Sequence, residues 1–253
     1  MIDINCDMGE SFGPWVMGAD AEVMPHITSA NVACGGHAGD PSVMRRTVRA
    51  AKAHGVAVGA HPGFADLQGF GRREMQADPS EVEDSLLAQI GALAAIARAE
   101  GMPVRHVKAH GALYNMAARD RRLADAIAQA IKAFDPSLVM FALPNSPMVQ
   151  AGIAAGLRVA AEGFADRSYE PDGSLTPRSR AGAVIHDVDR VVDRAVRMVR
   201  DGVVLTPDGK EVPLKVDTIC VHGDTPGADV SARELRKALT QAGITVRAVG
   251  AKS

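Results

Sequence analysis

Short apolar segments that end in a polar residue, followed by a turn and a helix, recur along this chain. The clearest example is the buried segment Ser29 to Cys34, which a pair of glycines ends before His37. Asp40 then suits the N-cap of a helix and Pro41 suits its first position, where a missing N–H has no consequence. A polar side chain placed just after a strand and before a helix is the usual arrangement of active-site residues in α/β folds.

This alternation predicts an α/β chain with a parallel sheet and right-handed crossovers. With seven or eight such units in 253 residues, we expect one domain, residues 1–253, folded as an irregular (β/α) barrel of seven or eight mostly parallel strands. A doubly wound sheet is the alternative. The predicted strands cover residues 1–6, 29–34, 56–60, 104–109, 138–143, 157–161, 217–221 and 244–249. The predicted helices cover residues 41–54, 79–101, 119–134, 147–156, 187–200 and 231–242, with a hairpin within 203–216.

Polar side chains follow most of the predicted strands. In a parallel barrel all these strand ends meet at the same rim. Taken singly, an aspartate there is as readily a helix cap and a histidine a surface residue, but histidines or lysines at several strand ends indicate an active site. The residues concerned are Asp7, Glu10, His37, Asp40, His61, Lys108, His110, Glu162, Asp166, Arg167, His222 and Asp224.

Imidazoles and a carboxylate at one rim suit two kinds of hydrolytic chemistry. They can hold a divalent metal that lowers the pKa of a bound water to about 7. Without a metal they can act as general acids and bases, as can a lysine whose pKa is lowered by burial and positive neighbours. Either mechanism fits attack on a carbonyl carbon, with Lys108 or Arg167 near the developing oxyanion.

The residue types at the rim lead to three sets of predicted roles. The predicted metal ligands are Asp7, His37, His61 and His110, although no short ligand spacing such as His-x-x-x-His supports them. The predicted catalytic residues are Asp7, Lys108, His110, Glu162, Asp166 and His222. The predicted substrate-binding residues are Glu10, Arg72, Arg167 and Asp224.

Several classes of function find no support in the sequence. A net charge of −2 without a basic cluster argues against a nucleic-acid partner. We expect no membrane partner and a cytoplasmic location, because no apolar run reaches spanning length and the three scattered cysteines suit a reducing compartment. No phosphate-binding loop is present, so a familiar ATP site is missing.

Two loops have open interpretations. The segment around Gly69, Gly71 and Arg72 suits either an anion site or a solvated loop. The long polar loop Ser168–Gly182 is typical of a lid or a disordered segment.

Seven motifs, in order along the chain, resemble those of the LamB/YcsF family. They span nearly the whole sequence, so the resemblance is specific. The motifs are Asn5-Cys6-Asp7-Met8-Gly9-Glu10, Asn31 to Asp40 (NVACGGHAGD), Ala60-His61-Pro62-Gly63, Gly69-Phe70-Gly71-Arg72-Arg73, Val107 to Asn115 (VKAHGALYN), Glu162 to Arg167 (EGFADR) and Val221-His222-Gly223-Asp224.

The resemblance implies a fold and an activity. Members are similar to the glycoside hydrolase/deacetylase superfamily of distorted barrels. They act with two partner subunits as an ATP-dependent 5-oxoprolinase that opens 5-oxo-L-proline to L-glutamate. Related deacetylases use an aspartate and two histidines for a metal, which implies Asp7, His61 and His110 here, with His37 as an extra candidate. The missing phosphate loop fits partners that handle ATP.

Two alternative functions stay open from the sequence. One is a stand-alone metal-dependent deacetylase or amidohydrolase, which would act without ATP or partners. The other is a subunit that delivers 5-oxoproline to partners that hold the catalytic groups.

Overall fold

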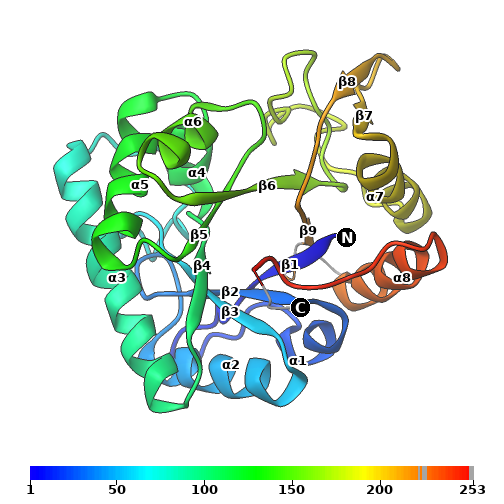
Figure 1. The fold of residues 1–253 in the computed structure, drawn as a ribbon. Coiled ribbons are helices and arrows are strands. Elements are labelled where there is room, and N and C mark those ends of the chain that lie inside the picture. The colour runs from blue at the N-terminus through cyan, green and yellow to red at the C-terminus, as the bar shows by residue number, and fades with distance from the viewer. Residues whose placement is uncertain (222, 224–226, 251–253) are drawn as a thin grey trace.

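Seven parallel strands form a closed barrel in the computed structural model, which describes residues 1–221, 223 and 227–250. The strands follow one another around the barrel in chain order, and the last pairs with the first (Figure 1). The prediction of an irregular barrel of seven or eight mostly parallel strands is therefore confirmed. The strands are β1 (Asp3–Met8), β2 (Ser29–Ala33), β3 (Ala57–His61), β4 (Val104–Val107), β5 (Val139–Ala142), β6 (Arg158–Phe164) and β9 (Thr218–Val221).

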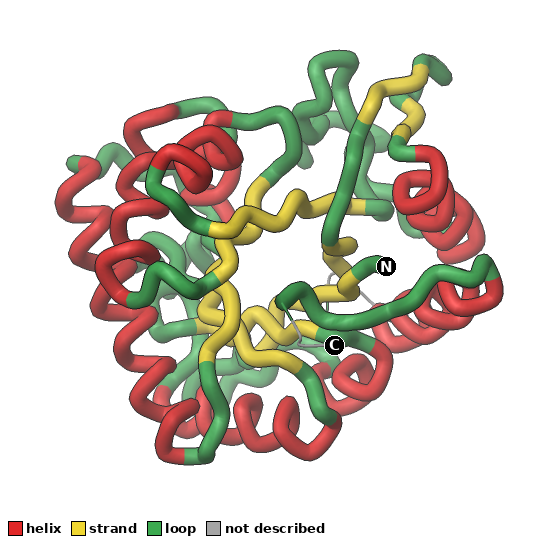
Figure 2. Tube along the Cα trace, in the orientation of Figure 1, coloured by secondary structure: helices red, strands yellow, loops and turns green. Residues whose placement is uncertain are grey.

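Helices surround the barrel on its outside, as Figure 2 shows. The predicted cap of the helix that begins at Pro41 is confirmed: the Asp40 carboxylate accepts hydrogen bonds from the backbone N–H groups of Ser42 and Val43. Within the described residues, no helix is long and apolar enough to cross a membrane. The helices are α1 (Asp20–Val23), the 3₁₀ turn η1 (Met24–His26), α2 (Pro41–His54), α3 (Pro79–Ala99), α4 (Gly111–Ala117), α5 (Arg121–Phe134), α6 (Pro147–Ala154), α7 (Val188–Asp201) and α8 (Ala228–Gln241).

The predicted last strand, residues 244–249, is wrong. Only Val246 pairs, in an isolated bridge to Ile2, and the segment passes across the end of the barrel at which the strands begin (Figure 1). Val249 packs there against Val139, Phe141 and Ala160, which form a small apolar cluster apart from the main core. The apolar residues that suggested a strand cover one end of the barrel instead.

Three other elements differ from prediction. Strand β6 continues through Glu162 and Gly163 to Phe164, so Glu162 lies within the strand rather than beyond it. Helix α4 was missed, because it begins at a glycine and His110 provides no side-chain cap that would signal a helix start. Helix α8 begins at Ala228, three residues earlier than predicted. The predicted hairpin is confirmed as the antiparallel pair β7 (Val203–Leu205) and β8 (Glu211–Pro213).

The inside of the barrel is polar over much of its length. Asp3 accepts hydrogen bonds from the hydroxyl groups of Thr28, Ser29 and Thr218, at 2.6, 2.8 and 2.5 Å. Burial nevertheless raises the pKa of the Asp3 carboxyl to about 6. The Thr218 hydroxyl also accepts a hydrogen bond from the amide of Asn5 at 2.8 Å, which carries the polar contacts toward the other end of the barrel.

Gly59 makes room for the imidazole of His106 inside the barrel. A Cβ at position 59 would lie 2.0 Å from His106 Nε2, and the ring is held by stacking on Phe141 with centroids 4.2 Å apart. We expect Gly59→Ala to lower the free energy of unfolding by about 1–3 kcal/mol, because the ring must move within a packed interior. Gly91→Ala is the matched control: a Cβ there meets nothing, and in a helix the change should stabilise by up to about 1 kcal/mol. Equal unfolding midpoints in urea for the two variants would contradict this account.

Candidate active site

Three histidines and a glutamate gather at the end of the barrel where the strands finish. One ligand atom from each of Glu10, His37, His61 and His110 lies within 4.8 Å of the others, and all four side chains are buried. His61 is the last residue of β3, and His110 immediately precedes α4. The rings of His37 and His110 stack with centroids 3.6 Å apart. The structure thus brings together residues from four strand–helix connections, as the strand alternation predicts.

Backbone carbonyl groups fix which nitrogens of two imidazoles carry hydrogen. His61 Nδ1 lies 2.8 Å from the carbonyl oxygen of Lys108, and His110 Nε2 lies 2.8 Å from that of Phe70. A carbonyl oxygen only accepts, so both of these nitrogens must be the donors. In neutral rings the remaining nitrogens, His61 Nε2 and His110 Nδ1, then both carry lone pairs, yet they lie 2.9 Å apart. Such a contact is stabilised by a cation or a shared proton between them.

His37 and His110 favour the neutral form. Burial, together with the neighbouring His61, lowers the pKa of His110 to about 3. Burial and the neighbouring His110 also hold the pKa of His37 well below its usual value. Among the described residues, His37 Nδ1 has no hydrogen-bond partner. Neutral imidazoles with free lone pairs are metal ligands or general bases rather than cations.

An ion group lies beside the histidines. Lys108 Nζ is 2.8 Å from Asp7 Oδ1, 2.9 Å from Glu162 Oε1 and 3.1 Å from Cys220 Sγ. Burial favours the neutral amine, but Asp7, Cys220 and Glu162 outweigh it and raise the pKa of Lys108 well above its usual value. The prediction that burial and positive neighbours would lower this pKa is therefore wrong. This direction favours the ammonium form of Lys108, which has no lone pair with which to act as a general base.

The carboxylate within the histidine cluster is that of Glu10, whereas Asp7 borders it. Glu10 Oε1 lies 3.3 Å from His37 Nε2 and 3.5 Å from His110 Nδ1. One oxygen of Asp7 is engaged by Lys108, and the other lies 3.3 Å from His61 Nε2. Burial raises the pKa of Asp7, but His61 and Lys108 outweigh it, so that the pKa lies well below the usual value.

The remaining predicted site residues lie in different surroundings. Arg72 places its guanidinium carbon 5.0 Å from the ring centroid of Phe70, and that ring meets His37 and His110 edge-on. The guanidinium of Arg167 is buried and donates to the carbonyl oxygens of Ala183 and Thr176, so it holds the loop that follows β6. Asp166 lies at the start of the same loop, where its carbonyl oxygen accepts from the N–H of Ile185. His222 and Asp224 lie outside the described residues.

Several polar residues around the site were missed from the sequence. Asn31 and His106 line the barrel under Asp7, and Tyr114 on α4 faces Glu162, which together with burial raises the pKa of the tyrosine. One signal was available. Asp3, Asn5 and Asp7 alternate along a strand that is covered on both sides, which indicates polar residues facing the barrel interior.

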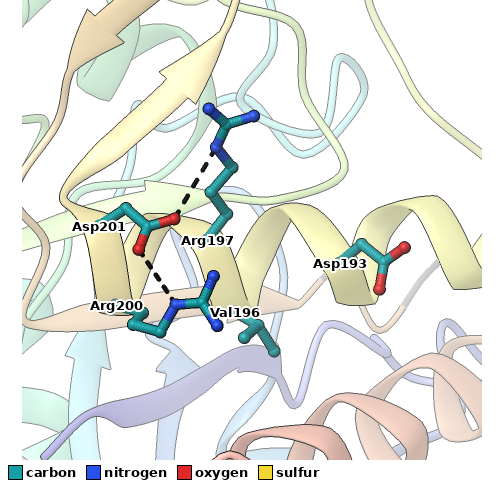
Figure 3. A pocket seen from close by; sticks show the side chains of 5 residues that line it. All are labelled: Asp193, Val196, Arg197, Arg200 and Asp201. Carbon is teal, nitrogen blue, oxygen red and sulfur yellow. Dashed lines mark hydrogen bonds and ion pairs between the residues drawn. The ribbon is translucent and has the colours of Figure 1, made fainter.

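A surface pocket of about 460 Å³ lies on α7, far along the chain from these residues. It is lined by Asp193, Val196, Arg197, Arg200 and Asp201 (Figure 3). Both arginines pair with Asp201, at 3.9 and 3.0 Å, and the lining includes no histidine. The pocket therefore offers no chemistry comparable with that of the histidine cluster.

Comparison with known proteins gives consistent matches over the whole chain. The model of the LamB/YcsF family matches residues 2–253. A relative from Symbiobacterium thermophilum that is named as a 5-oxoprolinase subunit is 57% identical over 250 residues, covering 99% of this chain and 96% of that protein. The protein of the same name from Bordetella pertussis is 56% identical over 247 residues, covering 98% of each. The crystal structure of a lactam utilization protein from Thermus thermophilus superposes with a TM-score of 0.94 at 52% identity, covering 98% of this chain and 99% of that one.

Proposed function

This chain belongs to the LamB/YcsF family, and from that premise we propose that it is one of the subunits of an ATP-dependent 5-oxoprolinase. With partner subunits it opens the lactam of 5-oxo-L-proline to give L-glutamate. The observation that carries the proposal is the buried cluster of Glu10, His37, His61 and His110 in a chain so similar to proteins of that name. A five-membered lactam resists simple hydrolysis, so coupling to ATP can drive its opening. Since the sequence has no phosphate-binding loop, we assign ATP to the partners.

We further propose that the four clustered side chains hold a divalent metal ion. The facing lone pairs of His61 and His110 suit it, and a carbonyl group orients the outer nitrogen of each ring, as is usual for metal-bound histidine. Charge agrees as well: the site holds three carboxylates, of which Asp7 and Glu162 share the ammonium group of Lys108 while Glu10 lies against the histidines. When bound, such a metal lowers the pKa of its water and polarises a carbonyl group. Glu10 replaces Asp7 in the ligand set inferred from sequence.

The other residues then have separate roles toward the lactam. Asp7, held by Lys108 and facing His61, accepts a proton from the attacking water. Arg72, at the rim beside Phe70, binds the carboxylate of the substrate. Tyr114, whose hydroxyl keeps its proton beside the carboxylate of Glu162, supplies the proton that the leaving ring nitrogen requires. The proposal also includes the catalytic roles predicted from sequence for Asp166 and His222. It likewise includes the substrate-binding roles predicted for Arg167 and Asp224.

The test of the activity is glutamate release from 5-oxo-L-proline. We expect turnover only when the chain, its partner subunits and ATP are all present. ATP-dependent turnover by the chain alone would refute the assignment of ATP to the partners. Release of acetate from N-acetylated sugars, without ATP or partners, would instead establish the deacetylase alternative.

The test of the metal is its stoichiometry in protein purified without chelators or a metal-affinity tag. We expect about one divalent ion per chain. Replacing His37 with glutamine should lower the affinity for added metal by about 10-fold or more, since one ligand is weakened. His54→Gln, on the exposed end of α2, is the matched control and should bind as the native chain does. A stoichiometry near zero in metal-supplemented buffer rejects the site.

A further inference from the structure

We infer that Asn31 and His106, inside the barrel, are positioning residues for Asp7. They hold its carboxylate so that Oδ2 is directed toward His61. The inference rests on the proposed function, because it concerns the group that accepts the proton of the attacking water. Both residues are buried and lie below the rim, because both pair in register with Gly59, two residues before His61 at the end of β3. They act on the reaction only through Asp7.

The amide of Asn31, on β2, donates both of its N–H bonds to side chains of the neighbouring strand β1. Its Nδ2 donates to Asp7 Oδ1 at 2.8 Å and to Asn5 Oδ1 at 2.7 Å. Asp7 Oδ1 therefore receives two donors, this amide and the ammonium group of Lys108 at 2.8 Å. With that oxygen held from two sides, the other oxygen of Asp7 is directed toward His61 Nε2, at 3.3 Å.

The hydrogen bond from His106 fixes the orientation of the Asn31 side-chain amide. His106 Nε2 lies 2.7 Å from Asn31 Oδ1, and that oxygen can only accept, so the ring donates through Nε2. If the amide were reversed, its NH₂ group would face the N–H of His106 and its oxygen would face the carboxylate of Asp7. Both contacts would then be repulsive. The imidazole is neutral, because burial, together with the neighbouring Lys108, lowers the pKa of His106 to about 3.

The position of His106 is itself fixed by packing. Its ring stacks on Phe141, with an interplanar angle of 8°, and fills the space left by the absent side chain of Gly59. The line of contacts therefore runs from a rigid apolar base through His106 and Asn31 to the carboxylate of Asp7. A carboxylate held in this way needs no reorientation when it accepts a proton, which is the benefit expected of a preorganised site.

Two variants of His106 separate positioning from stability. His106→Leu removes the donor, and we expect kcat for glutamate release by the full complex to fall about 10- to 100-fold with KM unchanged. His106→Gln keeps an N–H at similar reach and should recover most of kcat. Ser29→Ala, which removes a buried hydrogen bond to Asp3 in the same barrel, is the control and should leave kcat unchanged. Equal kcat values for His106→Leu and the native chain would overturn the inference, as would an equal loss in His106→Gln.

Nitrogen-15 NMR of the imidazole rings tests the geometry without any activity. In this chain, without partners or substrate, we expect His106 to be neutral with its hydrogen on Nε2. A hydrogen on Nδ1 would overturn the inference, because the ring could not then donate to Asn31. If the native complex released no glutamate, the proposed function would fail, and the tautomer alone would decide whether His106 orients Asn31.

Discussion

Replacing Lys108 with methionine is expected to lower the free energy of unfolding by about 3–5 kcal/mol. The ammonium group is buried and lies between Asp7 and Glu162, at 2.8 and 2.9 Å. A methionine fills a similar volume but leaves the buried carboxylate of Glu162 and the partly buried carboxylate of Asp7 without their cation. The loss should appear in urea unfolding of the chain alone, independently of partners or substrate.

The control for this prediction lies on the outside of the barrel. Lys132 is exposed on α5, so Lys132→Met should change the free energy of unfolding by less than about 0.5 kcal/mol. Combining Lys108→Met with Glu162→Gln should restore part of the stability, because one uncompensated carboxylate is removed. If the double variant is less stable than Lys108→Met by the full cost of Glu162→Gln alone, Lys108 and Glu162 do not stabilise each other.

The order of strands and helices could be predicted from the sequence, because local signals fix it. A cap such as Asp40, followed by a proline and an apolar stripe, marks a helix wherever the segment finally packs. The segment 244–249 has the same apolar character as a strand but no neighbour left to pair with, since β9 already closes the barrel onto β1. Its packing across the barrel end depends on that closure, which no local pattern reveals.

The gathering of polar residues at one rim could also be predicted, since it follows from parallel strands. What could not be predicted depends on which way each side chain points within the barrel. Lys108 reaches from the end of β4 to Glu162 on β6 and Cys220 on β9, and these contacts reverse the expected direction of its pKa shift. In the same way Glu10 joins the three histidines, while Asp7, the expected ligand, is held by Lys108 and Asn31.

Replacing His61 with glutamine is expected to lower kcat for glutamate release by about 10²- to 10⁴-fold. His61 contacts both the histidine cluster and the ion group of Lys108. Its Nε2 lies 2.9 Å from His110 Nδ1 and 3.3 Å from Asp7 Oδ2. Glutamine can occupy the space and donate to the carbonyl oxygen of Lys108, but it offers no basic nitrogen toward Asp7. The assay is glutamate release at saturating 5-oxo-L-proline and ATP, with the partner subunits present.

The same variant decides between catalysis and delivery. A subunit that only delivers substrate would keep its turnover at saturating substrate after His61→Gln, with the loss confined to KM. His110→Gln should reproduce the loss in kcat, because His110 shares the cluster, whereas His54→Gln on the surface of α2 should not. Thermal unfolding of each variant shows whether the chain is still folded. If the folded variants keep the native kcat, the catalytic groups for lactam opening lie in the partner subunits and not in this barrel.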